Sequence, residues 1–377
     1  TRGWLESVTR SSRRTSSWAE PMRLWVLGLL VVGCTCKETR RSDAGTRLRK
    51  VDVHVHAEPA AVPHLLALMN THGIDVAWNL SGGWPGSGLE DALAAANATN
   101  GRVLVFANPP LGMLRQGADV NAMAEQLRVA HDLGARGVKF FKSLGLGARW
   151  PDGSLVAVDD PRLDPLFEQA GALGMPVAIH TGDPKAFWLP ATQENERFDE
   201  LSVHPGWSYA GRPVPTWSAL YEAFLRRVAR HPHTTFVGVH FGNDPEDPGA
   251  VSAALDQYPN LFVDTAARVP ELGRRPEVMR AVLAKHPTRV LFGTDLGVGV
   301  GVGEFDLMLG SAGATPPGPS DVAHFFSSTW RFFETNDRDF EHPTPIQGRW
   351  RISGLGLSRE ALERLYSGNA DQLMRSR

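Results

Sequence analysis

Asp52-Val53-His54-Val55-His56 closes a short segment rich in valine. Successive side chains of a strand point to opposite faces, so His54 and His56 leave one face about 6–7 Å apart along the backbone. Two imidazoles at this spacing can converge on a single metal ion. Alone, a His-x-His pattern is weak evidence, because such pairs also arise by chance at protein surfaces. Its meaning depends on what the rest of the chain places beside it.

Length and composition set the first limits. With 377 residues, 42% of them hydrophobic, the chain can bury a large core, and an α/β barrel of about 250 residues or more is a normal single domain. The formal net charge of -2, with no basic stripe in the body, argues against nucleic-acid binding. Cys34 and Cys36 are the only cysteines, so the body has neither a disulfide framework nor a thiolate metal site.

The N-terminal segment has the features of a targeting signal. Met22-Arg23 is followed by the apolar run 24–32, which is too short to span a bilayer, and then by Gly33-Cys34. This resembles a bacterial lipoprotein signal with residues 31–34 as the lipobox and Cys34 as the lipidated residue. A short hydrophobic helix or strand is the alternative.

The resulting domain plan has three parts. We expect a signal segment over 1–33 with Met22 as its start, a polar tether over 34–48 and one barrel domain over 49–377. The expected location is the bacterial cell envelope, with the domain lipid-anchored and facing the periplasm or the exterior. The expected partners are a small-molecule substrate, the membrane through the anchor and a second copy of the chain in a homodimer.

Apolar, strand-like runs alternate with helix-like segments along the body. The runs cover 50–56, 74–80, 102–107, 136–141, 176–180, 234–240, 260–265 and 288–293. Helical spacing is found between them, as in 121–133, 163–173, 217–230 and 276–285, and a closing helix over 357–373 has Ser358 as its N-cap.

Eight such units predict an α/β fold with a (β/α)8 TIM-like barrel. A doubly wound open sheet is the alternative, but no Gly-rich phosphate turn follows the first strand. Irregular insertions follow strand five (184–217) and strand eight (296–350). Both are candidate lids, because loops after barrel strands build active sites.

Polar residues stand at the ends of the other predicted strands. They are Lys139 after strand four, His180 after strand five, His240 after strand six and Asp295 after strand eight. A barrel brings these ends to one face, where His54, His56, His180 and Asp295 would supply three nitrogens and one oxygen to a divalent metal.

Two roles stay open at this point. His240 could be a fourth nitrogen ligand, or it could polarise a substrate carbonyl or shuttle a proton. Asp295 could both bind the metal and take a proton from a bound water.

Several stretches resemble the amidohydrolase superfamily, in particular its amidohydrolase-related (amidohydrolase 2) branch. They are DVHVH (52–56), GVKFF (137–141), PVAIHTG (176–182), VGVHFGN (237–243), LFVDTAAR (261–268), RVLFGTDLG (289–297) and SREALERLYSGNADQL (358–373). The resemblance extends over about residues 50–373 and implies a distorted barrel. It implies His54, His56, His180 and Asp295 as metal ligands, His240 in the acid/base role, and one divalent metal, zinc in many members and manganese in some.

Other residues have open roles. In binuclear relatives a lysine in the place of Lys139 is carboxylated and bridges two metals, whereas an unmodified amine paired with a carboxylate is the alternative. Arg268 and Lys142 could each hold an anionic substrate group or form a loop salt bridge. Trp84, after the second strand, is a substrate-binding candidate by position.

These features predict a metal-dependent hydrolase acting on an amide, lactone or ester bond of a small polar substrate through metal-activated water. A non-oxidative decarboxylase of an aromatic or muconate-type acid is the first alternative, since this branch contains such enzymes. A lipoprotein that binds a metal or ligand without turnover is the second.

Overall fold

The computed structural model describes residues 47–299 and 307–375. Residues 47–377 form one compact unit, and the predicted lipobox, Cys34 and nearly all of the predicted tether lie outside the described residues. Within the described ranges, no helix is long and apolar enough to cross a bilayer.

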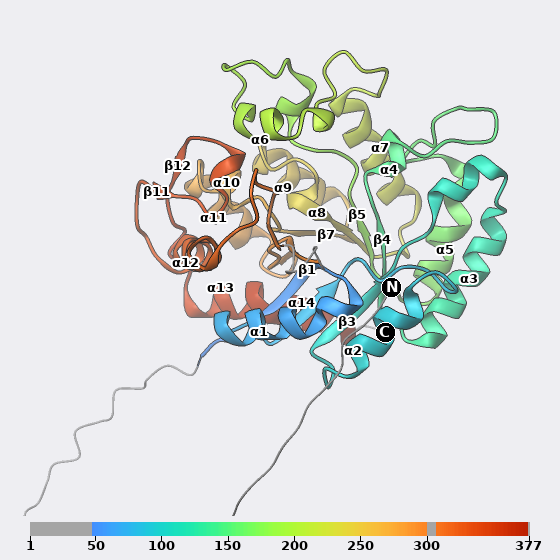
Figure 1. Cartoon of the computed structure of the whole chain (residues 1–377), viewed down its shortest axis with the longest axis horizontal. Helices are drawn as coiled ribbons and strands as arrows, with labels where there is room; N and C mark the ends of the chain where they lie inside the picture. Colours follow the sequence, from blue (N-terminus) through green and yellow to red (C-terminus); the bar gives the residue numbers. More distant parts are fainter. Residues whose placement is uncertain (1–46, 300–306, 376–377) are drawn as a thin grey trace, which may run out of the picture. The chain divides into compact units, whose positions relative to one another are not determined.

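Eight parallel strands form the centre of the fold, in chain order (Figure 1). They are β1 (Val51–Ala57), β2 (Val76–Asn79), β3 (Val103–Ala107), β4 (Gly137–Phe140), β5 (Val177–Ile179), β6 (Phe236–Gly238), β7 (Leu261–Asp264) and β8 (Val290–Leu291). All eight predicted strands are present, each at the predicted place. Their side chains are largely buried, as expected for parallel strands covered on both faces.

The first and last strands meet, which closes the ring. The Val53 N–H donates to the Phe292 carbonyl at 2.9 Å, and the Asp295 N–H donates to the His54 carbonyl at 2.9 Å. The barrel prediction is therefore confirmed, and an open doubly wound sheet is excluded.

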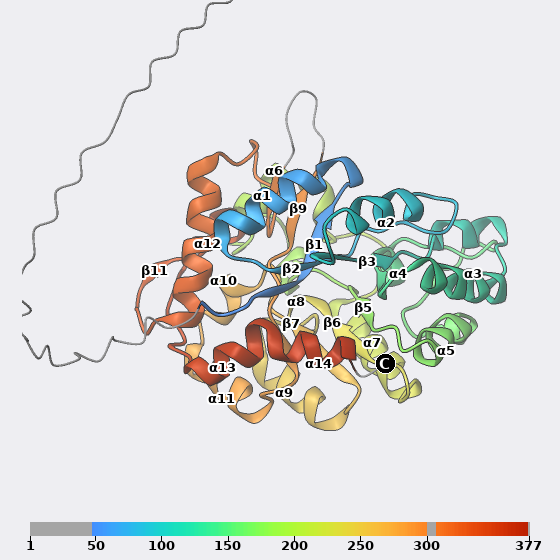
Figure 2. The same cartoon turned by 90° about the horizontal axis from the view of Figure 1, so that it is seen from below.

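Helices cover the outside of the ring (Figure 2). They are α1 (Val62–His72), α2 (Leu89–Asn97), α3 (Val120–Leu133), α5 (Asp164–Ala172), α7 (Trp217–Arg230), α9 (Pro248–Gln257) and α11 (Pro276–Lys285). The short α4 (Ser143–Leu146) and α10 (Val269–Leu272) follow the ends of β4 and β7. The helix ends follow from the sequence: Thr216 caps α7 by accepting from the Ala219 N–H, and α3 stops at Gly134, whose φ of 118° suits a residue without a side chain.

The C-terminal segment closes the end of the barrel away from the strand C-termini. It comprises α13 (Arg359–Glu363), a π-helical turn (Arg364–Gly368) and α14 (Asn369–Arg375), with Ser358 as the N-cap as predicted. Ala370 and Leu373 of α14 pack in one apolar cluster with Val51 and Val53 of β1.

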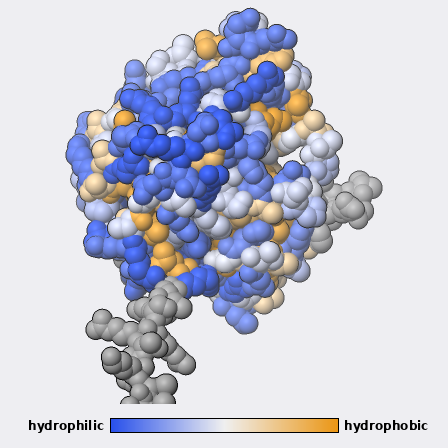
Figure 3. Space-filling model, turned by 90° about the vertical axis from the view of Figure 1, so that its left-hand side faces the viewer, coloured by the Kyte–Doolittle hydropathy of each residue, from blue (hydrophilic) through white to orange (hydrophobic). Residues whose placement is uncertain are grey.

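Both predicted insertions are present. The first contains short helical turns (Lys185–Trp188 and Pro205–Trp207) and α6 (Phe198–Val203). The second contains β9 (Leu296–Val298), β10 (Leu307–Leu309), α12 (Pro319–Glu334), β11 (Phe340–Glu341) and a turn (Pro345–Gln347), and β12 (Arg351–Ile352) directly follows it. β9 extends the sheet beside β1, and most α12 aromatics are buried in the main core, so they serve packing. The face on the left of Figure 1 is mostly hydrophilic, with separate apolar areas (Figure 3).

Candidate metal centre

Three ligand atoms form a small triangle at the seam of the barrel. The Nε2 atoms of His54 and His56 lie 3.2 Å apart, and each lies 3.3 Å from Asp295 Oδ1. Tetrahedral bonds of 2.0–2.1 Å place neighbouring ligand atoms about 3.3–3.4 Å apart. Two imidazole nitrogens and one carboxylate oxygen at this spacing fit a divalent metal such as zinc.

The far nitrogens of both histidines are held by hydrogen bonds. His54 Nδ1 lies 2.8 Å from Asp264 Oδ2, and His56 Nδ1 lies 2.7 Å from Ser81 Oγ. A proton on each Nδ1 satisfies these partners and leaves the lone pair of Nε2 facing the triangle. Histidines that bind a metal through one ring nitrogen usually donate a hydrogen bond from the other, as both do here.

Asp264, at the end of β7, was not singled out from the sequence. Besides contacting His54, it accepts hydrogen bonds at Oδ1 from the backbone N–H groups of His240 (2.8 Å) and Ala266 (3.1 Å). One fully buried carboxylate thus positions residues from three strand ends. The available signal was an acid directly after the apolar run Leu-Phe-Val.

Asp52 is a second positioning carboxylate that sequence reasoning missed. It accepts from the Thr294 hydroxyl at 2.5 Å and from the backbone N–H groups of Thr294 and His54 at 3.0 and 3.1 Å. Burial raises the pKa of Asp52 to about 7, although these hydrogen bonds oppose the shift. Asp52 therefore ties β1 to the residue just before Asp295.

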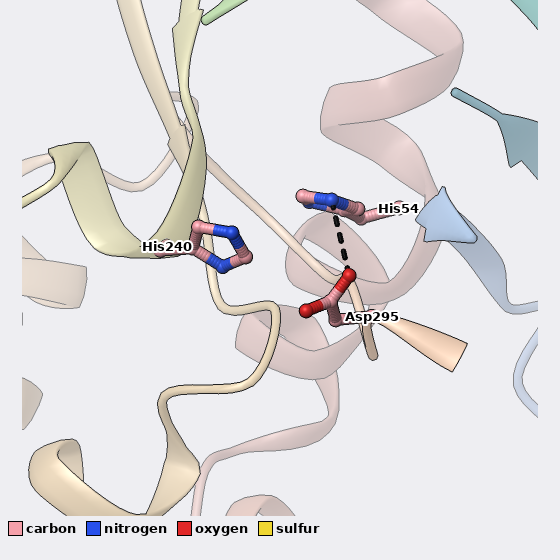
Figure 4. Close-up of side chains that lie close together, drawn as sticks. All are labelled: His54, His240 and Asp295. Atoms are coloured by element: carbon pink, nitrogen blue, oxygen red, sulfur yellow. Dashed lines mark ion pairs between the residues drawn. The ribbon is translucent and has the colours of Figure 1, made fainter. Parts of the chain in front are cut away.

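His240 faces the triangle from the turn after β6, labelled α8 (Val239–Gly242). Figure 4 shows His54, His240 and Asp295 pointing toward one another, and one potential ligand atom of each lies within 4.8 Å of the others. His240 has a φ of 54°, in the left-handed region that is sparsely populated by residues with a side chain. Its Nδ1 is 2.9 Å from the Ala266 carbonyl, so Nε2 is the free nitrogen.

His180 lies beside this group rather than within it. Its ring meets the His240 ring edge-on at 4.4 Å between centroids, while its Nε2 is 3.1 Å from the Gly182 carbonyl. Burial, assisted by nearby cations such as Lys139, lowers the pKa of His180 well below its usual value. A neutral His180 can bind a metal only through Nδ1 in this arrangement, and its role as a ligand stays a prediction.

The charge states of the central groups are set by their surroundings. Burial alone would raise the pKa of Asp295, but His54, His56 and His240 outweigh it and hold that pKa well below the usual value. Burial, with a smaller contribution from His180, lowers the pKa of His240 well below its usual range. The site therefore combines an ionised carboxylate with two imidazoles, His56 and His240, whose pKa values are lowered by burial.

Lys139 is buried on β4, with its Nζ 3.5 Å from His54 Nε2. Burial lowers the pKa of Lys139 to about 8, partly offset by Asp264 and Asp295. Among the described residues no carboxylate forms an ion pair with Lys139, in contrast to the paired ammonium weighed above.

A cavity of about 200 Å³ adjoins the triangle. Barrel strands and both insertions line it, with Pro184, Phe187, Glu200 and Trp207 from the first insertion and Met308, Gly310, Ser311 and Gln347 from the second. The prediction that both insertions reach the site is consistent with this lining.

The three predicted substrate-binding residues have different positions. Arg268 and Lys142 line the cavity, but Lys142 forms a salt bridge with Asp183 at 2.7 Å, the loop pairing weighed from the sequence. Trp84 does not line the cavity: it lies buried in the main hydrophobic cluster, because its loop folds back onto α2. Trp84 is therefore corrected to a packing residue.

The two insertions are joined by a buried charged cluster that the sequence did not reveal. Arg197 of the first insertion pairs with Glu200 at 3.0 Å and with Glu271 of α10. The Ser311 hydroxyl of the second insertion donates to Glu200. We call these four residues the insertion clasp, since they join both insertions to α10.

A barrel in which histidines and a carboxylate converge at the strand ends is the architecture of a metal-binding enzyme. The family model described as Amidohydrolase matches residues 51–375, and the chain belongs to this family, its amidohydrolase 2 branch. The resemblance inferred from the sequence is thereby confirmed, and the chain is an enzyme of the amidohydrolase family.

Solved structures agree on the fold. A 2,6-dihydroxybenzoate decarboxylase, in complex with 2,6-dihydroxybenzoate, superposes with a TM-score of 0.52 at 17% identity, covering 87% of this chain and 100% of that one. A TIM-barrel protein from Bordetella bronchiseptica gives 0.50 at 17% identity, covering 88% and 100%. No curated protein sequence matched the chain.

Proposed function

We propose that the protein is a metal-dependent hydrolase that cleaves an amide, lactone or ester bond of a small anionic substrate. One observation carries this proposal: the ionised carboxylate of Asp295 lies 3.3 Å from both Nε2 atoms of His54 and His56, with neutral His240 beside it. Ligands, a proton acceptor and a proton carrier are thus within one group of side chains.

The residues of the group would hold the metal and move a proton. His54, His56 and Asp295 would hold the metal, with His180 as a further ligand, and zinc suits this donor set best, with manganese as the alternative. When bound, the metal supplies a water of lowered pKa and polarises the scissile carbonyl. Asp295 would take a proton from this water, and the free Nε2 of His240 would receive that proton and pass it to the leaving group.

The charges around the cavity favour an anionic substrate. Its lining contains three cationic side chains (Lys139, Lys142, Arg268) and three carboxylates (Asp183, Glu200, Asp295), so +3 − 3 = 0, and a divalent ion brings the sum to +2. Lys142 is engaged with Asp183, whereas Arg268 has no carboxylate partner among the described residues. Arg268 is therefore the group that would hold an anion.

A decarboxylase of an aromatic acid is the second candidate. The cavity is lined by Phe141, Phe187 and Trp207 together with the cationic Arg268, which would suit a planar aromatic carboxylate. The fold is also similar to that of a 2,6-dihydroxybenzoate decarboxylase. A protein that binds metal without turnover is the third candidate.

One experiment separates the three candidates. The full-length chain is purified, its metal content per chain is measured, and it is assayed on lactones, amides, esters and aromatic acids, with Asp295→Asn as the inactive control. Hydrolysis lost in the control supports the proposal. Release of carbon dioxide would replace it with the decarboxylase, and stoichiometric metal without turnover would favour the binder. Two metals per chain, reduced to one by Lys139→Met, would establish a binuclear site instead.

We also propose that Cys34 anchors the chain in the bacterial envelope, on the strength of the lipobox at 31–34. Metabolic labelling with palmitate should mark the wild type and not Cys34→Ser. Equal labelling of both chains would contradict the anchor.

A further inference from the structure

Two residues of the cavity lining carry a buried polar atom that has no hydrogen-bond partner. These atoms are the Nε of Arg268, a donor, and the Oε1 of Gln347, an acceptor. Buried polar groups in folded proteins are almost always paired, and each unpaired one costs about 1–3 kcal/mol. Both residues line the same small cavity, so a ligand in that cavity is the candidate partner for both atoms.

Gln347 is held so that its oxygen stays available. The side chain is 1% exposed, and its Nε2 donates to the Gly310 carbonyl at 3.2 Å. Only the NH2 group can make that bond, which fixes the orientation of the amide and leaves Oε1 free. The surrounding segment is anchored as well, because the Thr344 hydroxyl donates to the Leu309 carbonyl at 2.9 Å.

Arg268 stands on the side of the cavity near the histidines. It is 5% exposed and makes one hydrogen bond, from a terminal nitrogen to the carbonyl of Ala267 at 3.1 Å. Its positive charge is among the causes that lower the pKa of His180 and of His240, after burial. The guanidinium therefore lies close to the candidate metal centre with donor capacity unused.

We propose that Arg268 and Gln347 form a two-point subsite that selects a small carboxylate carrying a hydroxyl group. The carboxylate accepts from Arg268, and the hydroxyl donates to Gln347 Oε1. This inference rests on the proposed function, which it narrows to substrates whose acid portion is a hydroxy acid. A hydroxyl suits the subsite better than an ammonium, because the cavity with a divalent ion already has a net charge of +2 by the sum given above.

The test uses butyrate and its 2-, 3- and 4-hydroxy derivatives as ligands. Each is titrated calorimetrically into the full-length, zinc-loaded protein, and the acids differ only in the presence and position of one hydroxyl. Contacts of the carboxylate alone with the zinc or Arg268 are common to all four acids and cancel in the comparison. Chelation of the zinc by the hydroxyl of 2-hydroxybutyrate does not involve Gln347, so it would persist in Gln347→Met and is recognised by that. The hydroxyl position that binds best reports the separation of the two anchoring points.

We expect at least one hydroxybutyrate to bind about tenfold more tightly than butyrate, as one hydrogen bond to a buried acceptor predicts. Gln347→Met should reduce this ratio to about 1 and leave the affinity for butyrate nearly unchanged. Arg268→Met should weaken the binding of all four acids. Gln193→Met, at an exposed glutamine, is the matched control and should retain the wild-type ratio.

Equal binding of all four acids by the wild type, or no binding at all, would overturn the inference without any variant, and water would then be the partner of the two atoms. A ratio that persists in Gln347→Met would overturn it as well. These outcomes do not depend on turnover. Failure of the hydrolase proposal appears only in the substrate assays, so the two failures are distinguishable.

Discussion

The strand-end side of the cavity and the insertion side hold their polar groups by different means. On the strand-end side, short hydrogen bonds to the carboxylates of Asp264 and Asp52 fix His54 on β1, His240 after β6 and Thr294 after β8. On the insertion side, the insertion clasp joins segments that have little regular structure of their own. We infer that the strand ends determine the chemistry, and that the insertions determine which molecule reaches it.

The largest effect is expected on turnover, when Asp295 on the strand-end side is replaced. Asp295→Asn keeps the size of the side chain but removes its charge, so the metal loses a ligand and the water its proton acceptor. Turnover should fall by about 10²–10⁴-fold. Steady-state kinetics and metal analysis check this, with circular dichroism to show an intact fold. Wild-type turnover in this variant would show that the chemistry lies elsewhere.

Breaking the insertion clasp should affect stability instead. Arg197→Met leaves Glu200 and Glu271 buried without their cation, and the free energy of unfolding should fall by about 3–5 kcal/mol. Denaturant unfolding measures the loss, and Arg349→Met, which removes an exposed pair with Asp199, is the control with a small effect. Metal content should not change. A variant that folds but binds no metal would contradict the inference that the strand ends alone determine the chemistry.

Acid should weaken the insertion side through His342. This buried imidazole accepts from the Thr344 N–H at Nδ1 and donates from Nε2 to the Gly348 carbonyl, so only its neutral form fits. Burial lowers the pKa of His342 from 6.5 to about 4. Because the folded pKa is depressed, the stability is fully present above pH 6.5 and is lost as the pH falls toward 4, by about 3 kcal/mol.

The variant His342→Gln isolates this contribution, because all other groups titrate equally in both proteins. Unfolding free energies measured from pH 7 to pH 4 should fall less steeply in His342→Gln than in the wild type. His131→Gln, at an exposed histidine, should follow the wild type. Parallel curves for all three proteins would refute the assignment.

The smallest effect is expected from substituting Asp264, which does not face the metal but hydrogen-bonds the ligand His54. Asp264→Asn retains the shape of the side chain but weakens the hold on His54 Nδ1, and the affinity for metal should fall by about 10–100-fold. Competition with a chelator of known affinity measures the change. Asp321→Asn, at an exposed acid in α12, should leave the affinity unaltered.

The difference between strand ends and the contacts that hold them also explains what could be predicted from the sequence. The eight strands were predictable because each is an apolar run next to a helix-like segment, and the convergence of His54, His56 and Asp295 followed from the closure of a barrel. Local patterns contain this information. The sequence also placed both insertions correctly.

The partners of these residues were not predictable, because they depend on contacts between distant segments. Asp264 acquires its role from β1 and the turn after β6, and Arg197 from Glu271, 74 positions away. The misassigned Trp84 shows the converse: its position after a strand suggested the site, but the path of its loop directs it into the core.

The ligand triangle has one further consequence, because it straddles the seam where the barrel closes. His54 and Asp295 are separated by 295 − 54 = 241 positions, so a bound ion would cross-link nearly the whole body of the chain. Closing a loop of that length in the unfolded chain has an entropic cost on the order of 5 kcal/mol. Loss of the ion and opening of the barrel would then be linked events, and unfolding curves recorded with and without a chelator would differ accordingly. The metal ion that takes part in the reaction would therefore also stabilise the folded barrel.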